Sequence, residues 1–320
     1  MNLAFAWQLF GTRGTFLSKR HHAERGRSAI PNKTRCGLLQ RLRGRVVTIG
    51  RTIIVVATFL NFQLLDDLQN LPAPEILGEL SDIDIQELGP AFELFFLNQD
   101  SVGEILSILR RSTTIENLQH ATSGRNGRVD SNFSECEIVQ IPGSIAGVES
   151  ATWTSFLLRA QRAAEASGIV KNLAQALVGT LEEMAENVIW HSAATHTGLV
   201  GYKWESGRFE YCVGDAGIGV LESLRRNPIY VDLEEPLEAL HLALKNGVSR
   251  FRSDNQRGTG FNGLLRNIVK NCCDLRFHTY DAVVVYDGVA SCAKADAIKM
   301  KDFMAPMLRG FTISLSCKID

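Results

Sequence analysis

The strongest constraint on the fold is an apolar repeat in the middle of the chain. Its members are spaced three or four residues apart: Val170, Leu173, Leu177, Leu181, Met184 and Val188. This spacing places them on one face of a helix, which we expect to span residues 169–191. Two strand-like segments follow, at 198–204 and 208–213, and the turn residues between them predict a hairpin. A long amphipathic helix followed by antiparallel strands indicates an α+β fold.

The rest of the chain supports the same class. Further helices are predicted at 151–166, 236–244 and 263–271, and further strands at 46–60, 137–141, 274–280, 282–286 and 311–319. We therefore expect an α+β two-layer sandwich, in which helices cover one face of a mixed, mostly antiparallel sheet.

The predicted elements divide the chain into four parts. Residues 1–45 are expected to be a basic tail without stable structure, and residues 46–111 a small α/β region. The polar, glycine-containing stretch 112–135 is predicted to be a linker. The main domain is then expected to comprise residues 136–320.

Charge is distributed unevenly along the chain. The first 51 residues contain eleven Lys or Arg and one acidic residue, Glu24, whereas the whole chain has a net charge of −1. We do not expect a nearly neutral chain to be a general nucleic-acid binder. The arginine-rich start fits a disordered basic tail, and an organellar transit peptide has a similar composition.

Cysteine content and hydropathy favour a cytoplasmic protein. The seven cysteines are odd in number and form no C-x-x-C pair, so we expect neither a disulfide framework nor a thiolate zinc site. The most apolar run, Thr52–Leu65, has 14 residues, fewer than the ~20 that a membrane-spanning helix needs. The alternative is a membrane segment over Val46–Leu65, which requires that Arg51 be tolerated in it.

Three segments combine residues that suit ligand chemistry. In the first, Glu183, Asn187 and His191 follow one another at four-residue intervals and share one stripe of the predicted helix. A carboxamide oxygen can bind Mg²⁺, and a carboxylate can deprotonate a nucleophile. On its own, the same spacing is common in ordinary amphipathic helices.

The second segment follows a predicted strand and reads Val213-Gly-Asp-Ala-Gly-Ile-Gly-Val220. Asp215 lies where the chain leaves the sheet, and its carboxylate can accept a hydrogen bond from an exocyclic amine such as that of adenine. Gly217 and Gly219 allow a positive φ and close approach of a ligand to the backbone. A structural glycine-rich turn is the simpler alternative.

The third segment reads Arg257-Gly-Thr-Gly-Phe-Asn-Gly-Leu264 and directly precedes a predicted helix. Backbone N–H groups at such a helix start can hold a phosphate. Gly258, Gly260 and Gly263 match G-x-G-x-x-G, but a polar loop precedes them instead of a strand. A dinucleotide-binding βαβ unit is therefore not expected.

Taken together, the order of the three segments resembles the GHKL (Bergerat-fold) ATP-binding superfamily, the histidine kinase-like ATPases, over about residues 136–320. Glu183 and Asn187 match its N box, Asp215 with Gly217 and Gly219 its G1 box, and Gly258 with Gly260 its G2 box. The segment Gly310–Leu315 is similar to its closing Gly-Thr strand, with Phe311 inserted. Asn262 stands where many members have a third glycine.

The resemblance implies a role for each matching residue. Asp215, with Gly217 and Gly219, would bind adenine. Asn187 would hold Mg²⁺ between the phosphates, and Glu183 would be the general base. Arg257, Gly258, Thr259 and Gly260 would line the triphosphate of ATP.

Within the superfamily, the chain looks most like the anti-sigma regulatory serine kinases. The predicted helix 151–166, which precedes the N box, contains no histidine that could serve as a sensor histidine kinase acceptor. We expect a Mg²⁺- and ATP-dependent regulatory protein kinase or ATPase that acts on a protein partner, with a homodimer left open. The alternatives are a nucleotide-gated interaction module with little turnover and a histidine kinase with an atypical acceptor.

Overall fold

The computed structural model describes residues 46–49, 52–55, 58–59, 62, 83–84, 87–97, 113–125, 127–131, 134–205, 207–244, 273–288 and 300–319. The predicted tail at 1–45 and the predicted helix at 263–271 lie outside the described residues.

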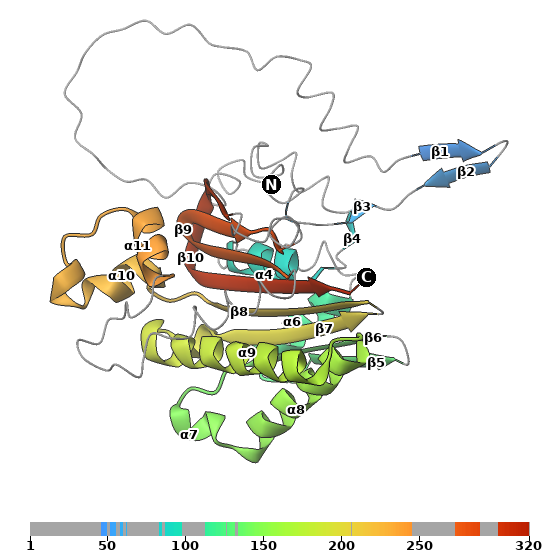
Figure 1. Cartoon of the computed structure of the whole chain (residues 1–320), viewed down its shortest axis with the longest axis horizontal. Coiled ribbons are helices and arrows are strands. Elements are labelled where there is room, and N and C mark those ends of the chain that lie inside the picture. The colour runs from blue at the N-terminus through green and yellow to red at the C-terminus, as the bar shows by residue number, and fades with distance from the viewer. Residues whose placement is uncertain are drawn as a thin grey trace, which may run out of the picture.

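A six-stranded antiparallel sheet forms the centre of the molecule, with the strand order β5-β6-β7-β8-β10-β9 (Figure 1). Its strands are β5 (Gly127–Ser131), β6 (Ser134–Gln140), β7 (Leu199–Glu205), β8 (Arg208–Asp215), β9 (Asp274–Tyr286) and β10 (Met300–Lys318). Two small sheets pair β1 (Val46–Ile49) with β2 (Thr52–Val55), and β3 (Thr58–Phe59) with β4 (Ile83–Asp84).

Two long helices, α8 (Ala151–Ala166) and α9 (Lys171–His191), cover one face of this sheet (Figure 1). The described residues form five more helices, α4 (Leu88–Leu97), α6 (Thr113–Thr122), α7 (Ile145–Val148), α10 (Gly219–Arg225) and α11 (Pro236–Ala243), and the 3₁₀ turns η2 (Thr195–Thr197) and η3 (Pro228–Tyr230). The predicted α+β class, the long amphipathic helix and the β7–β8 hairpin are confirmed.

The predicted two-layer arrangement is corrected by a second apolar core on the opposite face of the sheet. Helices α4 and α6 pack there against side chains that include Cys136, Ile138, Leu199 and Cys212. Strand β8 is apolar in consecutive positions, because Tyr211 and Val213 face α9 while Cys212 faces α4. Helices therefore cover both faces of the sheet.

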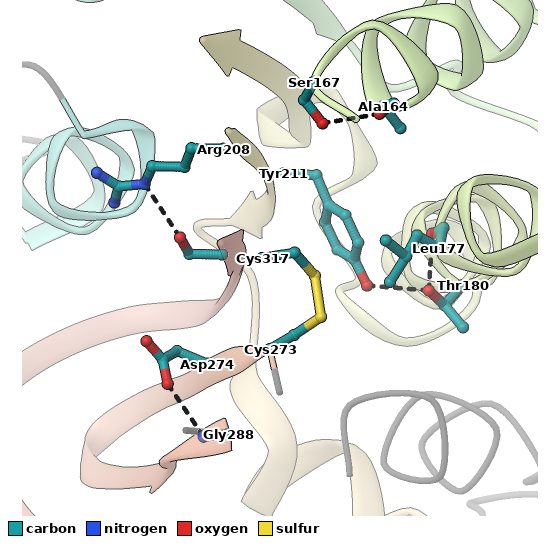
Figure 2. The surroundings of a disulfide bond; sticks show 11 residues. Ala164, Ser167, Leu177, Thr180, Arg208, Tyr211, Cys273, Asp274, Gly288 and Cys317 are labelled. Atoms are coloured by element: carbon teal, nitrogen blue, oxygen red, sulfur yellow. Dashed lines mark hydrogen bonds between the residues drawn. A yellow bond between two sulfur atoms is a disulfide. The ribbon is translucent and has the colours of Figure 1, made fainter. Parts of the chain in front are cut away.

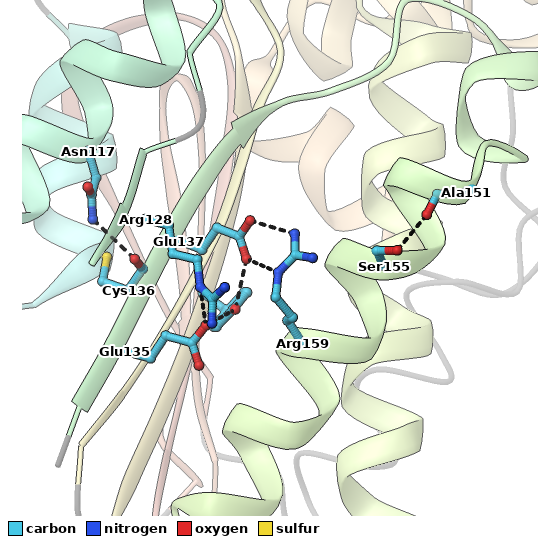
Figure 3. Close-up of polar contacts among 9 residues, drawn as sticks. Asn117, Arg128, Glu135, Cys136, Glu137, Ala151, Ser155 and Arg159 are labelled. Carbon is cyan, nitrogen blue, oxygen red and sulfur yellow. Dashed lines mark hydrogen bonds and ion pairs between the residues drawn. The ribbon is translucent and has the colours of Figure 1, made fainter. Parts of the chain in front are cut away.

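The predicted linker at 112–135 is corrected as well, since it contains α6 and β5. Helix α6 buries Ile115 and Leu118 in the second core, and Asn117 Nδ2 donates a hydrogen bond of 3.2 Å to the Cys136 carbonyl (Figure 3). The segment reads as polar because α6 buries only part of its surface and β5 is a short strand at the sheet edge.

A charged cluster joins α8 to the sheet (Figure 3). Arg159 on α8 donates two hydrogen bonds, of 2.8 and 2.7 Å, to the buried carboxylate of Glu137 on β6. The single proton of the Tyr202 hydroxyl is shared between the same carboxylate, at 2.9 Å, and Glu135, at 2.7 Å. Such paired, charge-assisted bonds fix orientation as well as distance, so they hold α8 at one angle on the sheet.

A second charged cluster attaches α4 to the opposite face. Arg276 on β9 donates hydrogen bonds of 2.8 and 2.7 Å to Glu93 on α4, and His278 Nδ1 lies 3.0 Å from the same carboxylate. Burial would raise the pKa of Glu93, but the attraction of Arg276 and His278 lowers it to about 2. The carboxylate is therefore ionised over the whole physiological range.

A disulfide bond joins Cys273, directly before β9, to Cys317 near the end of β10 (Figure 2). This corrects the prediction that the cysteines form no disulfide; Cys136 and Cys212 are free and buried. The pairing follows from strand register, because Ser316 opposes Asp274 and the next residues outward are the two cysteines. Structural disulfides are uncommon in reducing compartments, so the cytoplasmic localisation stays a prediction.

Within the described residues, none of the helices combines the length and the apolar character that crossing a bilayer requires.

Removal of the disulfide tests this arrangement. We expect the double variant Cys273→Ala/Cys317→Ala to lower the free energy of unfolding by about 2–4 kcal/mol, because the bond links residues 44 positions apart and restricts the unfolded chain. Urea denaturation measures the change, and Cys136→Ala, which removes a free buried thiol, is the matched control. Alkylation of Cys273 and Cys317 in unreduced, denatured protein would contradict the bond.

Candidate functional site

Asp215, the last residue of β8, lies on the face of the sheet that α9 covers. Side chains alternate along a strand, so Asp215 shares a face with Tyr211 and Val213. The Tyr211 hydroxyl lies 3.0 Å from Thr180 Oγ1 on α9, which fixes that face as the α9 side (Figure 2). The Asp215 side chain is thus buried beneath the same helix that carries Glu183 and Asn187.

The carboxylate of Asp215 differs from the other buried carboxylates among the described residues. Glu93, Glu137 and Glu210 each pair with an arginine. Among the described residues no basic side chain pairs with Asp215, whose Oδ1 accepts a hydrogen bond of 2.8 Å from the Gly217 N–H. Burial raises the pKa of Asp215 to about 7, and this hydrogen bond only partly opposes the rise.

The turn that follows Asp215 rests against the C-terminal end of α9. The Ile218 N–H donates a hydrogen bond of 2.8 Å to the Ser192 carbonyl, and a Cβ on Gly217 would lie 2.1 Å from the same oxygen. Only glycine therefore fits at position 217. The predicted glycine is required by the close approach of this turn to α9.

Gly219, where α10 begins, has a φ of +68°. A Cβ there would meet the Tyr280 ring at 2.8 Å and Thr279 Oγ1 at 2.9 Å. The positive φ and the crowding both require glycine at this position. Thr197 Oγ1 also stabilises this turn, because it accepts a hydrogen bond of 3.0 Å from the Ala216 N–H.

Asn187 lies on α9 one helical turn before His191, whose Nδ1 is 3.1 Å from Ser223 Oγ on α10. Asn187 is half-buried and its Nδ2 contacts Met184 Sδ at 3.8 Å. This end of α9 contacts both the turn after Asp215 and helix α10, so Asn187 and Asp215 lie on the same side of the sheet.

Glu183 lies one turn further from the Asp215 turn and is exposed at the surface. Partial desolvation, with repulsion from Glu186 and Glu182, raises its pKa. A raised pKa suits a general base, because it strengthens proton affinity. Arg257, Gly258, Thr259 and Gly260 lie outside the described residues.

Four neighbours of the candidate site were not predicted from the sequence. They all bond the backbone of the turn at 216–220: Ser192, Thr197, Thr279 and Tyr280. No local pattern marks them, because each reaches the turn through the tertiary arrangement of α9, η2 or β9.

Gly310, predicted as part of a closing Gly-Thr strand, lies directly against the turn. A Cβ at this position would lie 2.0 Å from the Asp215 carbonyl oxygen. Phe311, the residue inserted relative to that pattern, is the strand partner of Asp215. In the described part of the chain, no group of three or more His, Cys, Asp or Glu could hold a metal ion.

No model of a known protein family matches this sequence, and no curated protein is significantly similar to it.

The burial of Asp215 predicts a measurable effect on stability. Because its folded pKa of about 7 exceeds the unfolded value of 3.8, folding takes up a proton between these values, and stability falls as the pH rises through this window. We expect Asp215→Asn to raise the free energy of unfolding at pH 8 by roughly 1–3 kcal/mol, with a smaller gain at pH 5.

Urea denaturation at the two pH values measures this difference. Asp232→Asn, at an exposed position, is the matched control. A stability gain that is equal at pH 5 and pH 8, or a loss at pH 8, would show that Asp215 is ionised at ordinary pH values and stabilised by partners of its own.

Proposed function

We propose that this chain binds Mg²⁺-ATP as a GHKL-type protein and acts as a regulatory ATPase or serine/threonine protein kinase on a protein partner. The observation that carries the proposal is Asp215: a buried carboxylate, without a basic partner among the described residues, that is presented at a strand end by a glycine turn. Unpaired buried acids destabilise a fold and are typical of functional sites.

A purine amine would supply Asp215 with a side-chain partner that the described residues do not provide. The ionised carboxylate would accept a hydrogen bond from the exocyclic amine, and this bond would lower the pKa of Asp215 from about 7. Nucleotide binding is therefore expected to strengthen as the pH rises from 6 to 8.

Asn187 and Glu183 suit the phosphate end of the same ligand. The carboxamide of Asn187 fits Mg²⁺, which takes few protein ligands and completes its shell with phosphate oxygens and water. Glu183 is exposed and has a raised pKa, so it can take a proton from an attacking water or hydroxyl. Arg257, Gly258, Thr259 and Gly260 are proposed to line the triphosphate.

The proposal includes a Bergerat fold for this chain. The packing of helices α8 and α9 against an antiparallel sheet supports that fold, and the layer of α4 and α6 on the opposite face would be an addition to it.

Isothermal titration of ATP, with and without Mg²⁺, tests the proposal. Wild type is expected to bind, and Asp215→Asn to bind about 10–100-fold more weakly, since a charged hydrogen bond is lost. Asn187→Ala should abolish the effect of Mg²⁺ on affinity. If the wild-type protein does not bind ATP at pH 8, the proposed function is wrong.

Turnover separates the proposed reaction from its alternatives. Glu183→Ala is expected to keep ATP binding and to lose phosphate release or transfer, whereas Glu182→Ala, the neighbouring acid on α9, is the matched control. If the Glu183→Ala variant still regulates its protein partner as wild type does, a nucleotide-gated interaction module would be favoured. Acid-labile phosphate on the protein would favour a histidine kinase.

A further inference from the structure

One row of residues crosses three strands at the candidate site. Strand register pairs Asp215 of β8 with Phe311 of β10, and Phe311 with Thr279 of β9. Residues directly opposed in antiparallel strands project to the same face, so all three side chains lie on the α9 side of the sheet. Thr279 therefore lies two strands from Asp215, about 10 Å away.

The Thr279 hydroxyl links two segments that flank the Asp215 turn. It is fully buried, donates a hydrogen bond of 2.8 Å to the Gly310 carbonyl and accepts one of 3.2 Å from the Val220 N–H. Val220 is in the first turn of α10, whose leading N–H groups have no partner within the helix. A single side chain thus satisfies backbone groups from both β10 and α10.

Gly310 connects Thr279 to Asp215, the acid proposed to bind the base. A Cβ on Gly310 would lie 2.0 Å from the Asp215 carbonyl oxygen and 2.7 Å from the Gly217 nitrogen. The backbone of Gly310 is therefore in tight contact with the turn, and Thr279 holds its carbonyl. A shift of Gly310 would move the Gly217 N–H that bonds the Asp215 carboxylate.

Tyr280, the next residue of β9, also bonds the backbone of this turn. Its hydroxyl donates a hydrogen bond of 3.0 Å to the Ile218 carbonyl. Its φ is +52°, in the left-handed region that is strained for a residue other than glycine. Such strain persists where surrounding contacts impose it, and it is enriched at functional sites.

We propose that Thr279 and Tyr280 are positioning residues for purine recognition, which fix the Asp215–Gly219 turn so that the carboxylate and the Gly217 backbone present one rigid edge to the base. This role rests on the proposed binding of ATP. It assigns to β9 a part in base recognition, although neither residue is placed on the ligand itself.

The test compares a ligand with a base and one without. The affinities of wild type, Thr279→Val and Thr279→Ser for Mg²⁺-ATP and for Mg²⁺-tripolyphosphate are measured by titration calorimetry, well below each melting temperature. We expect Thr279→Val to weaken the binding of ATP at least about 10-fold and to have little effect on the binding of tripolyphosphate. Thr279→Ser, which keeps the hydroxyl, should stay within about 3-fold of wild type.

If Thr279 only stabilised the fold, its substitution would weaken the binding of both ligands by the same factor, because it would change only the folded fraction of the protein. If wild type binds ATP and Thr279→Val keeps the wild-type ratio of the two affinities, the positioning role is wrong while the proposed function stands. If wild type binds no ATP, both are wrong.

Tyr280→Phe covers the case in which Thr279→Val does not fold. It removes only the bond to the Ile218 carbonyl and keeps the ring. We expect this variant to bind ATP about 3–10-fold more weakly than wild type and to bind tripolyphosphate with unchanged affinity. An unchanged ratio of affinities in this variant would overturn the inference.

Discussion

The structure depends on a central strand, β8, that is buried on both faces and yet ends in a carboxylate. Burial of a charge is tolerated where a cation neutralises it, as Arg276 does for Glu93 and Arg159 for Glu137. Asp215 has no such partner among the described residues, and its pKa is raised to about 7 where that of Glu93 is lowered to about 2. Burial therefore has opposite effects on the pKa of these two acids. The lack of a basic partner among the described residues distinguishes Asp215 from Glu93, Glu137 and Glu210.

Much of the fold could be predicted from local sequence patterns. The helices at 151–166 and 169–191 and the hairpin at 198–213 follow from apolar periodicity and turn residues, which depend on near neighbours. The second helical layer was missed because its anchors, such as Phe96 against Gly214, join segments more than 100 residues apart. The Cys273–Cys317 bond was missed for a related reason, since it follows from the register of β9 with β10.

The candidate site divides in the same way. Asp215, Gly217 and Gly219 could be predicted because one short turn carries both the acid and the glycines that its geometry requires. Ser192 and Thr279 could not, because what they bond is set by tertiary packing and by the order of the strands. Local sequence patterns thus indicated the candidate site residues, whereas the residues that hold them in place follow only from the arrangement of the whole sheet.

Strand β9 contributes side chains to both faces of the sheet. Arg276 and His278 project toward α4 and contact Glu93, while Phe277 and Thr279 project toward α9 and the Asp215 turn. On β8, which is separated from β9 by β10, Phe96 of α4 packs where a Cβ on Gly214 would be, directly beside Asp215. A displacement of α4 would therefore act on β9 and on the end of β8 at once. The segment that contains α4, predicted as a region separate from the main domain, is a structural support of the candidate site.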